Sequence, residues 1–233
     1  MMVKEELVKR SPVRIFEQSI NGGLKEGEIG IIASENGVGK TSVLVQLALD
    51  KLLQGKKVIH ISFTQHVHYV PLWYEDIFSE FAGKKNIENA EDVKNDFVKN
   101  RVLMNFNQDG VTKAQILKSL RALIIEGGFN ASSIIIDGFN FSRTNKESIA
   151  AVKAFAEELK VSVWYSCSVN NGAQSKENIP LVLNDYAEFI DVVIALLPKS
   201  DHVELLLSKD RGSNLSKSMA MKLDPKTLLI LEK

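Results

Sequence analysis

The stretch that most constrains this chain is "ASENGVGKTS", residues 33–42, which lies between an apolar run and a helical run. It departs from the phosphate-loop pattern G-x-x-x-x-G-K-[ST] at one position, where Ser34 replaces the first glycine. Such loops point backbone N–H groups at phosphate oxygens, and the helix that follows adds positive potential. A small side chain can follow the chain as it leaves the strand. The sequence therefore predicts a loop that grips phosphate.

The residues of this loop have separate predicted roles. Gly37 and Gly39 permit the backbone angles and the close approach that the wrap requires. Lys40 would reach the β- and γ-phosphates, and Thr41 would supply a hydroxyl to Mg²⁺. The alternative is a glycine-rich turn that merely opens a helix. The predicted nucleotide-binding residues of the loop are Ser34, Glu35, Asn36, Gly37, Val38, Gly39, Lys40, Thr41 and Ser42.

Hydrophobic periodicity along the chain predicts an α/β fold. Apolar runs that read as strands alternate with helical patterns as far as residue 168, which favours parallel strand pairing. From residue 189 onward, three strand patterns follow one another with short connections and no helix between them. We therefore expect a mainly parallel, twisted sheet flanked by helices, with antiparallel strands at its C-terminal edge. The strand patterns cover 28–33, 58–63, 101–107, 132–140, 161–168, 189–198, 202–210 and 218–224.

Composition limits the class of protein and the partners. The 233 residues suit one folding unit, and 45% apolar with 25% charged residues is typical of a soluble globular chain. Because 29 basic and 29 acidic residues cancel, no overall field attracts nucleic acid or an anionic membrane. The single cysteine, Cys167, cannot form an intrachain disulfide. No apolar run spans a bilayer and the first residues lack a secretory h-region, so we expect a cytoplasmic protein without a membrane partner.

A carboxylate that could hold a metal ion follows the most compact strand pattern. The phrase "SSIIIDG" places Asp137 at the end of a strand that a parallel sheet would deliver beside the loop. In nucleotide-hydrolysing proteins of this type, such an acid holds Mg²⁺. The alternative is an aspartate that begins a turn, which "DG" also favours. We predict Thr41 and Asp137 as the metal-binding residues.

Over residues 14–231 the sequence resembles the RecA-type ATPases, and within them the branch of the KaiC clock proteins and the DnaB-type replicative helicases. The segment "NGGLKEGEIGIIASENGVGKTS" is similar to the family's G-G-L-x-x-G-E entry into the loop, and "VIHISF", "SSIIIDG", "FIDVVIALL" and "LLLSKDRGS" add to it. The resemblance implies one RecA-like domain over 1–233, with 1–13 as an N-terminal extension. It also implies ATP and Mg²⁺ as ligands, and assembly into a homo-oligomeric ring or filament or with a partner ATPase.

The resemblance raises a question about catalysis. Relatives carry a glutamate after the second strand, where it acts as general base toward the attacking water. Here "ISFTQH" places Thr64 and Gln65 at the candidate positions. Glutamine can orient a water but cannot accept its proton, so hydrolysis should be slow or absent unless another acid substitutes. Glu75 and Asp76 read better as solvated helix charges.

Two further groups are implied by the resemblance. Ser168, with Asn170 nearby, stands where relatives have a γ-phosphate sensor; ordinary polar residues at a loop entry are the alternative. Lys209 and Arg211 resemble a K-x-R pair that relatives project into a neighbouring subunit's nucleotide site; a solvated basic hairpin tip is the alternative. The predicted catalytic residues are Lys40, Gln65, Lys209 and Arg211.

Three functions are compatible with these features. The first is a slow ATPase, and the second is a non-hydrolysing module whose ATP occupancy controls assembly or partner binding. The third, a nucleic-acid motor, has the thinnest basis, because the loops that touch nucleic acid in relatives carry only Arg143, Lys146 and Lys176 as cations. His66 and His68 lack a third ligand nearby and indicate no metal site.

Overall fold

The computed structural model describes residues 11–63, 69–85, 90–169 and 179–233. Its strands are β1 (Ile29–Ser34), β2 (Lys57–Ser62), β3 (Arg101–Asn105), β4 (Ala131–Asp137), β5 (Ser162–Ser168), β6 (Val192–Pro198), β7 (Val203–Asp210), β8 (Ser213–Leu223) and β9 (Ile230–Glu232). Its α-helices are α2 (Val13–Ser19), α3 (Lys40–Leu53), α4 (Tyr69–Lys85), α5 (Ala90–Asn100), α6 (Lys113–Arg121) and α7 (Lys146–Leu159). The π-helical η1 (Ala122–Glu126) and the 3₁₀-helical η2 (Phe141–Arg143) and η3 (Leu181–Phe189) complete the set.

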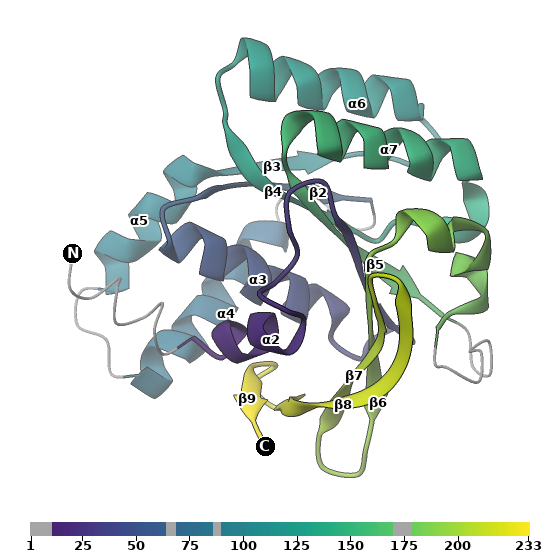
Figure 1. Ribbon diagram of the computed structural model, residues 1–233. Coiled ribbons are helices and arrows are strands. Elements are labelled where there is room, and N and C mark those ends of the chain that lie inside the picture. The colour runs from purple at the N-terminus through teal and green to yellow at the C-terminus, as the bar shows by residue number, and fades with distance from the viewer. Residues whose placement is uncertain (1–10, 64–68, 86–89, 170–178) are drawn as a thin grey trace.

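The described strands form one sheet in the order β3-β2-β4-β5-β1-β6-β7-β8-β9. The pairings from β3 to β6 are parallel, and those of β7, β8 and β9 are antiparallel. Figure 1 shows the antiparallel strands curling away at one end of the sheet. The predicted fold class is confirmed. The short strand β9 was not predicted, because three residues carry no periodicity.

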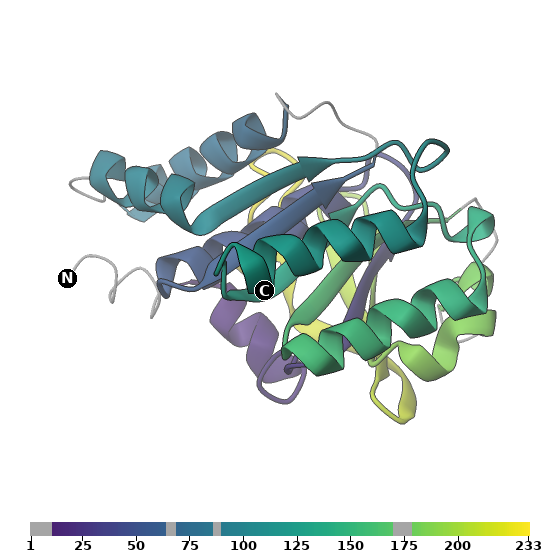
Figure 2. The ribbon, with the colours of Figure 1, turned by 90° about the horizontal axis from the view of Figure 1, so that it is seen from above.

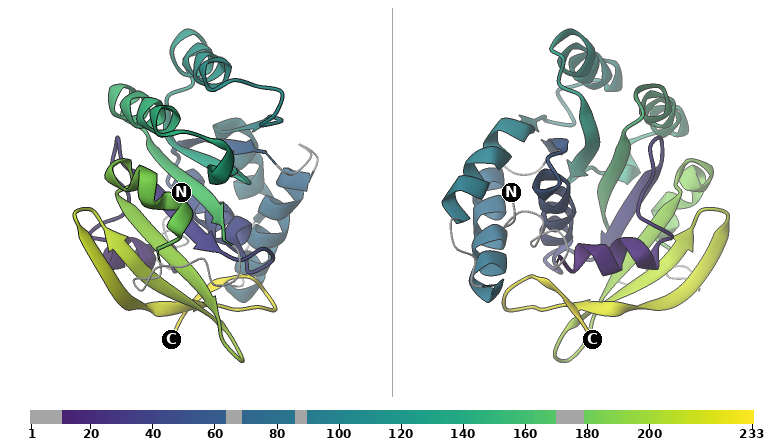
Figure 3. Two further views of the ribbon diagram at one scale, coloured as in Figure 1. Left: turned by 90° about the vertical axis from the view of Figure 1, so that its right-hand side faces the viewer. Right: turned by 60° about the vertical axis from the view of Figure 1, so that its left-hand side comes forward.

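Helices cover both faces of the sheet. Helices α2, α3, α4 and α5 pack on one face, and α6, α7 and η3 pack on the other (Figures 1 and 2). Figure 3 shows the sheet between these two layers. Each layer buries its own apolar core, centred on Leu44 and Tyr74 on the first face and on Phe155 and Leu183 on the second. Within the described residues, no helix is long and apolar enough to cross a membrane.

The parallel register determines where the candidate site forms. Ser34 at the end of β1 lies opposite Ser168 at the end of β5, and Asp137 at the end of β4 lies opposite Ser62. Strand β5 lies between β1 and β4. Because parallel strands end at the same edge, the phosphate-loop sequence and Asp137 meet at the carboxyl edge of the sheet, where open α/β sheets bind ligands.

A buried histidine in β2 has a strongly perturbed pKa. His60 is 1% exposed, its Nδ1 lies 3.0 Å from the Tyr74 hydroxyl, and its Nε2 has no partner among the described residues. Burial lowers the pKa of His60 to about 4; Asp137 opposes this shift, and Arg101, which lies over the Tyr74 ring, adds to it. The folded-state pKa lies below the unfolded value of about 6.5. The contribution of neutral His60 to the free energy of unfolding is therefore fully present above pH 6.5 and is lost as the pH falls toward 4.

We therefore expect acid to destabilise the domain partly through His60. Between pH 6.5 and 4, this residue should contribute a loss of about 3 kcal/mol in the free energy of unfolding. Urea unfolding of wild type and His60→Gln across this range measures it, since the amide keeps a neutral hydrogen-bonding group but cannot be protonated. Identical pH slopes for the two proteins would contradict the assignment.

Candidate nucleotide-binding site

The loop between β1 and α3 depends on two glycines. Gly37 and Gly39 have φ angles of 80° and 117°, in the left-handed region that side chains rarely adopt. A Cβ atom at Gly39 would also lie 2.5 Å from a methyl carbon of Leu223. At Gly37 a Cβ would meet nothing within 4 Å, so the backbone is open to approach there. The loop is therefore tightly packed at Gly39 and open to a ligand at Gly37.

Lys40, the first residue of α3, lies folded over this loop. Its Nζ donates to the backbone oxygens of Glu35 at 2.8 Å and Ser34 at 3.0 Å. The residue is 8% exposed, and burial lowers the pKa of Lys40, while the nearby Asp137 carboxylate opposes the shift. The ammonium group is thus held at the loop by two carbonyls, and its third contact, to the Ser34 hydroxyl at 3.4 Å, is the longest of the three.

The two predicted metal-binding residues lie together. The Thr41 hydroxyl donates to Oδ2 of Asp137 at 2.8 Å. Asp137 is 4% exposed, and the next residue, Gly138, donates its N–H to the Ser166 hydroxyl at 2.7 Å. Asp137 therefore ends its strand in a fixed position beside the loop.

A cavity of about 850 Å³ lies in front of these residues. Pockets of this size accommodate ligands as large as nucleotides. Loop residues and Asp137 line one side, and Trp73 of α4 and Leu228 of the β8–β9 connection contribute apolar surface. Sequence reasoning missed Trp73 and Leu228, because both come from distant segments that only the packing brings to the loop. The other residues at this cavity are Gly138, Phe139, Asn140, Phe141, Ser142, Ser166, Ser168, Val169 and Val182.

Two predicted serines have different surroundings. Ser168 lines the cavity, and its hydroxyl donates to the Asn36 side-chain oxygen at 2.8 Å. Ser42, by contrast, is fully buried and its hydroxyl donates to the Leu228 backbone oxygen. Gln46, one turn later, donates to the same oxygen at 2.9 Å and accepts from the Ile230 N–H at 2.8 Å. The Ser42 side chain thus helps fasten α3 to the C-terminal strands and does not face the cavity.

The predicted K-x-R pair lies at the opposite edge of the sheet, where β7 meets the start of β6. Arg211 forms a two-pronged ion pair with Glu28, at 2.9 Å for each contact, and also pairs with Asp210. Its guanidinium donates further to the backbone oxygens of Gly23 at 2.9 Å and Ile20 at 3.1 Å. The side chain therefore joins three segments of its own chain.

Lys209 is also engaged within its own chain, because its Nζ donates to the Ala187 backbone oxygen in η3. Burial lowers the pKa of Lys209, and Asp191 opposes the shift. A role for either residue in a neighbouring subunit's site stays a prediction, and it would require these hydrogen bonds to open.

The remaining predicted residues either lie outside the described ranges or lie exposed or paired with acidic residues. Thr64, Gln65, His66, His68, Asn170 and Lys176 lie outside the described residues. Glu75 and Asp76 lie exposed on α4. Arg143 pairs with Asp109 at 2.9 Å, and Lys146 pairs with Glu188. In the described part of the chain, no three His, Cys, Asp or Glu residues cluster as a metal site would require, so a metal here would depend on the Thr41–Asp137 pair and its ligand.

A glycine-bearing loop between a buried parallel strand and a helix, with a lysine folded over it, is the architecture of the P-loop class of α/β domains. Over 47 residues the chain is 39% identical to the DNA repair protein RadA of Aquifex aeolicus (strain VF5), covering 20% of this chain and 10% of that protein. Over 91 residues it is 31% identical to the DNA repair and recombination protein RadB of Methanococcoides burtonii (strain DSM 6242 / NBRC 107633 / OCM 468 / ACE-M), covering 39% of this chain and 36% of that protein.

The two similarities cover only part of each relative. The matched segments span about a tenth of the RadA protein and about a third of the RadB protein. No family model matches the chain. The similarities agree with the RecA-type resemblance of the sequence, whereas the branch of KaiC and DnaB stays a prediction.

Proposed function

We propose that this domain binds ATP together with Mg²⁺ in the cavity at the carboxyl edge of its sheet. The observation that carries the proposal is the meeting of Lys40, Thr41 and Asp137 at one cavity, with Thr41 and Asp137 in hydrogen-bond contact at 2.8 Å. The similarity to RadA and RadB supports it. The loop N–H groups and the α3 amino terminus would hold the phosphates, and Lys40 would exchange its long contact to the Ser34 hydroxyl for a phosphate oxygen.

The residues present fit a magnesium ion. Mg²⁺ prefers oxygen ligands and keeps several of its waters, so one hydroxyl and one nearby carboxylate suffice when a phosphate supplies the rest. Thr41 would provide the hydroxyl, and Asp137 would hold a coordinated water. Bound there, Mg²⁺ would neutralise charge on the β- and γ-phosphate oxygens.

We propose that hydrolysis is slow or absent, since Thr64 and Gln65 stand where RecA-type relatives have the glutamate base. Under this proposal ATP acts mainly as a ligand whose presence changes assembly or partner binding. The two forms of this proposal are a non-hydrolysing module and a slow ATPase in which Gln65 orients the water. Both forms share the same nucleotide site and differ only in the release of phosphate.

A second candidate function is supported by the names of the two relatives, which concern DNA repair and recombination. DNA is therefore a candidate partner of this chain, although Arg143 and Lys146 are each held by an acidic residue. Titration of a fluorescent single-stranded oligonucleotide, with and without ATP, would test this candidate; binding that is absent in both conditions would remove it.

The metal part of the proposal predicts the behaviour of Asp137→Asn. In wild type, replacing EDTA by Mg²⁺ should tighten ATP binding, and the substitution should reduce this Mg²⁺ effect by about 10- to 100-fold, because the amide cannot orient a metal-bound water as the carboxylate does. Fluorescence of Trp73 at the cavity reports the binding, since Trp164, the other tryptophan, is buried against Gly30.

The matched control is Asp76→Asn, which removes an exposed carboxylate from α4. This variant should keep the full Mg²⁺ effect. The proposal fails if wild type binds ATP equally with Mg²⁺ and with EDTA, or if Asp137→Asn and Asp76→Asn respond alike.

A further inference from the structure

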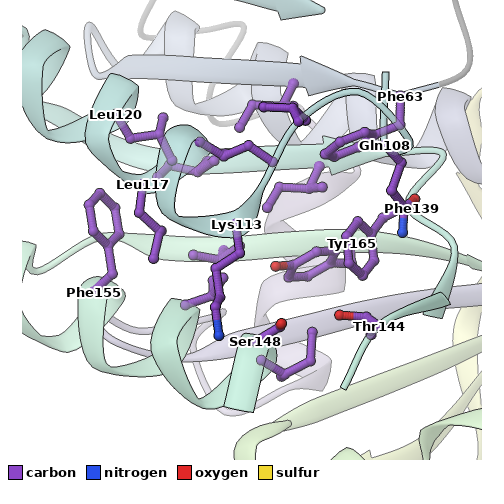
Figure 4. A pocket seen from close by; sticks show the side chains of 18 of the residues that line it. Phe63, Gln108, Lys113, Leu117, Leu120, Phe139, Thr144, Ser148, Phe155 and Tyr165 are labelled. Atoms are coloured by element: carbon purple, nitrogen blue, oxygen red, sulfur yellow. The ribbon is translucent and has the colours of Figure 1, made fainter. Parts of the chain in front are cut away.

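A second cavity, of about 360 Å³, lies on the face of the sheet that α6 and α7 cover (Figure 4). Its floor is formed by apolar side chains of β2, β4 and β5, and its walls by apolar side chains of α6 and α7. Cavities of this size and character typically bind small ligands through an apolar lining and a few placed polar groups. The question is which polar groups this lining contains.

The first polar group is a buried phenol. Tyr165 is 2% exposed, and burial raises its pKa above the usual range. Its ring packs against the rings of Phe139 and Phe141, with centroid separations of 5.5 and 5.4 Å. Across the described residues its hydroxyl has no hydrogen-bond partner, and Figure 4 shows the hydroxyl directed into the cavity. The hydroxyl is open to the cavity, so an occupant with an acceptor oxygen can take a hydrogen bond from it.

The second polar group is a cation at the mouth. Lys113, the first residue of α6, lines the cavity and forms no ion pair within the described part of the chain. Arg143 also lines it, but Asp109 neutralises Arg143 at 2.9 Å. Ser148, in the first turn of α7, also lines the cavity. Lys113 is therefore the one cation of this lining without an acidic partner among the described residues.

We propose that this cavity is a binding site for a small molecule with an apolar body and one anionic group, such as a monocarboxylate. The body lies against the sheet between α6 and α7, and the anionic group is held by Lys113 and the Tyr165 hydroxyl. Phe139 lines both this cavity and the proposed nucleotide site, and it follows Asp137 by two residues. An occupant therefore contacts a side chain that also borders the nucleotide site. The proposal does not depend on nucleotide binding.

The test compares three probes with the same eight-carbon chain: octanoate, 1-octanol and octylammonium. Methyl-labelled isoleucines locate the binding, because Ile116, Ile134 and Ile149 line the cavity whereas Ile77 lies on the opposite face of the sheet. We expect saturable shifts of the three cavity isoleucines with octanoate, none at Ile77, and octanoate affinity at least fivefold above that of the other two probes.

Two variants separate the roles of the polar groups. Lys113→Met should remove the preference for octanoate over 1-octanol. Tyr165→Phe, which loses no hydrogen bond of the protein, should lower the affinity for octanoate several-fold. The control Lys118→Met removes an exposed lysine from the same helix away from the cavity and should change nothing. Absence of saturable shifts with all three probes, equal binding of octanoate and octylammonium, or equal effects of Lys113→Met and Lys118→Met would overturn the proposal.

Discussion

Lys40→Ala should lose at least about a hundredfold in ATP affinity, equivalent to ~3 kcal/mol, while the protein stays folded. The Lys40 ammonium is fixed at the loop by the Ser34 and Glu35 carbonyls, so it is in place before the ligand arrives. Hydrogen bonds between charged partners are about twice as strong as neutral ones, and alanine leaves the phosphates without their only cation from the loop. Alanine has the highest helix propensity, so we expect the substitution at the first residue of α3 to leave the helix intact.

The control for this prediction is Lys56→Ala, which removes an exposed lysine just after the far end of α3. Both variants lose one positive charge, so a general electrostatic effect would weaken ATP binding equally in each. Wild type and Lys56→Ala should give the same Trp73 fluorescence titration with ATP, and only Lys40→Ala should lose the response. Affinity within threefold of wild type in Lys40→Ala would contradict the position assigned to the phosphates.

Arg211→Ala should lower the free energy of unfolding by about 3 kcal/mol, which is large for one residue at a sheet edge. Its guanidinium binds Glu28 and Asp210, whose side chains are 14% and 8% exposed and would be left without their cation. It also joins the turn after α2 to the entrance of β1 through the Gly23 and Ile20 carbonyls. Arg211→Lys should recover little, because an ammonium cannot reproduce the two-pronged geometry.

Urea unfolding measures this effect, and two comparisons interpret it. Lys209→Ala should cost about 1 kcal/mol, since that side chain contributes one hydrogen bond to Ala187. Combining Arg211→Ala with Glu28→Gln should cost less than the sum of the single changes, because the second removes the charge that the first leaves unpaired. Stability of Arg211→Ala within 0.5 kcal/mol of wild type, a change typical of surface substitutions, would instead favour a free, projecting arginine.

The sequence predicts the parts of this domain that are encoded locally. The loop pattern and the compact "SSIIIDG" strand are each encoded by one continuous stretch of sequence. Parallel pairing alone then brings the ends of β1 and β4 to one edge of the sheet. The sequence alone therefore predicts that Lys40, Thr41 and Asp137 lie together. The α/β class follows from the alternation of strand and helix patterns and is confirmed.

What the sequence could not predict depends on packing between distant segments. The partners of Arg211 lie mostly more than 180 residues away, so the K-x-R phrase alone suggested a projecting pair. Ser42 follows the loop motif directly, yet the Leu228 carbonyl turns its hydroxyl toward the C-terminal strands. The position of Trp73 at the nucleotide cavity and the second cavity beneath α6 and α7 likewise depend on how the helices pack on the sheet. No periodicity in the sequence indicates any of these contacts.

We propose that this chain binds Mg·ATP and hydrolyses it slowly or not at all. The most direct measurement follows ATP binding and phosphate release in the same sample of wild-type protein with Mg²⁺, with Lys40→Ala as the blank and Thr64→Glu as the restored-base variant. We expect tight ATP binding by wild type, little phosphate release above the blank, and phosphate release that rises in Thr64→Glu. Absence of ATP binding by wild type, or rapid release that Thr64→Glu does not increase, would contradict it.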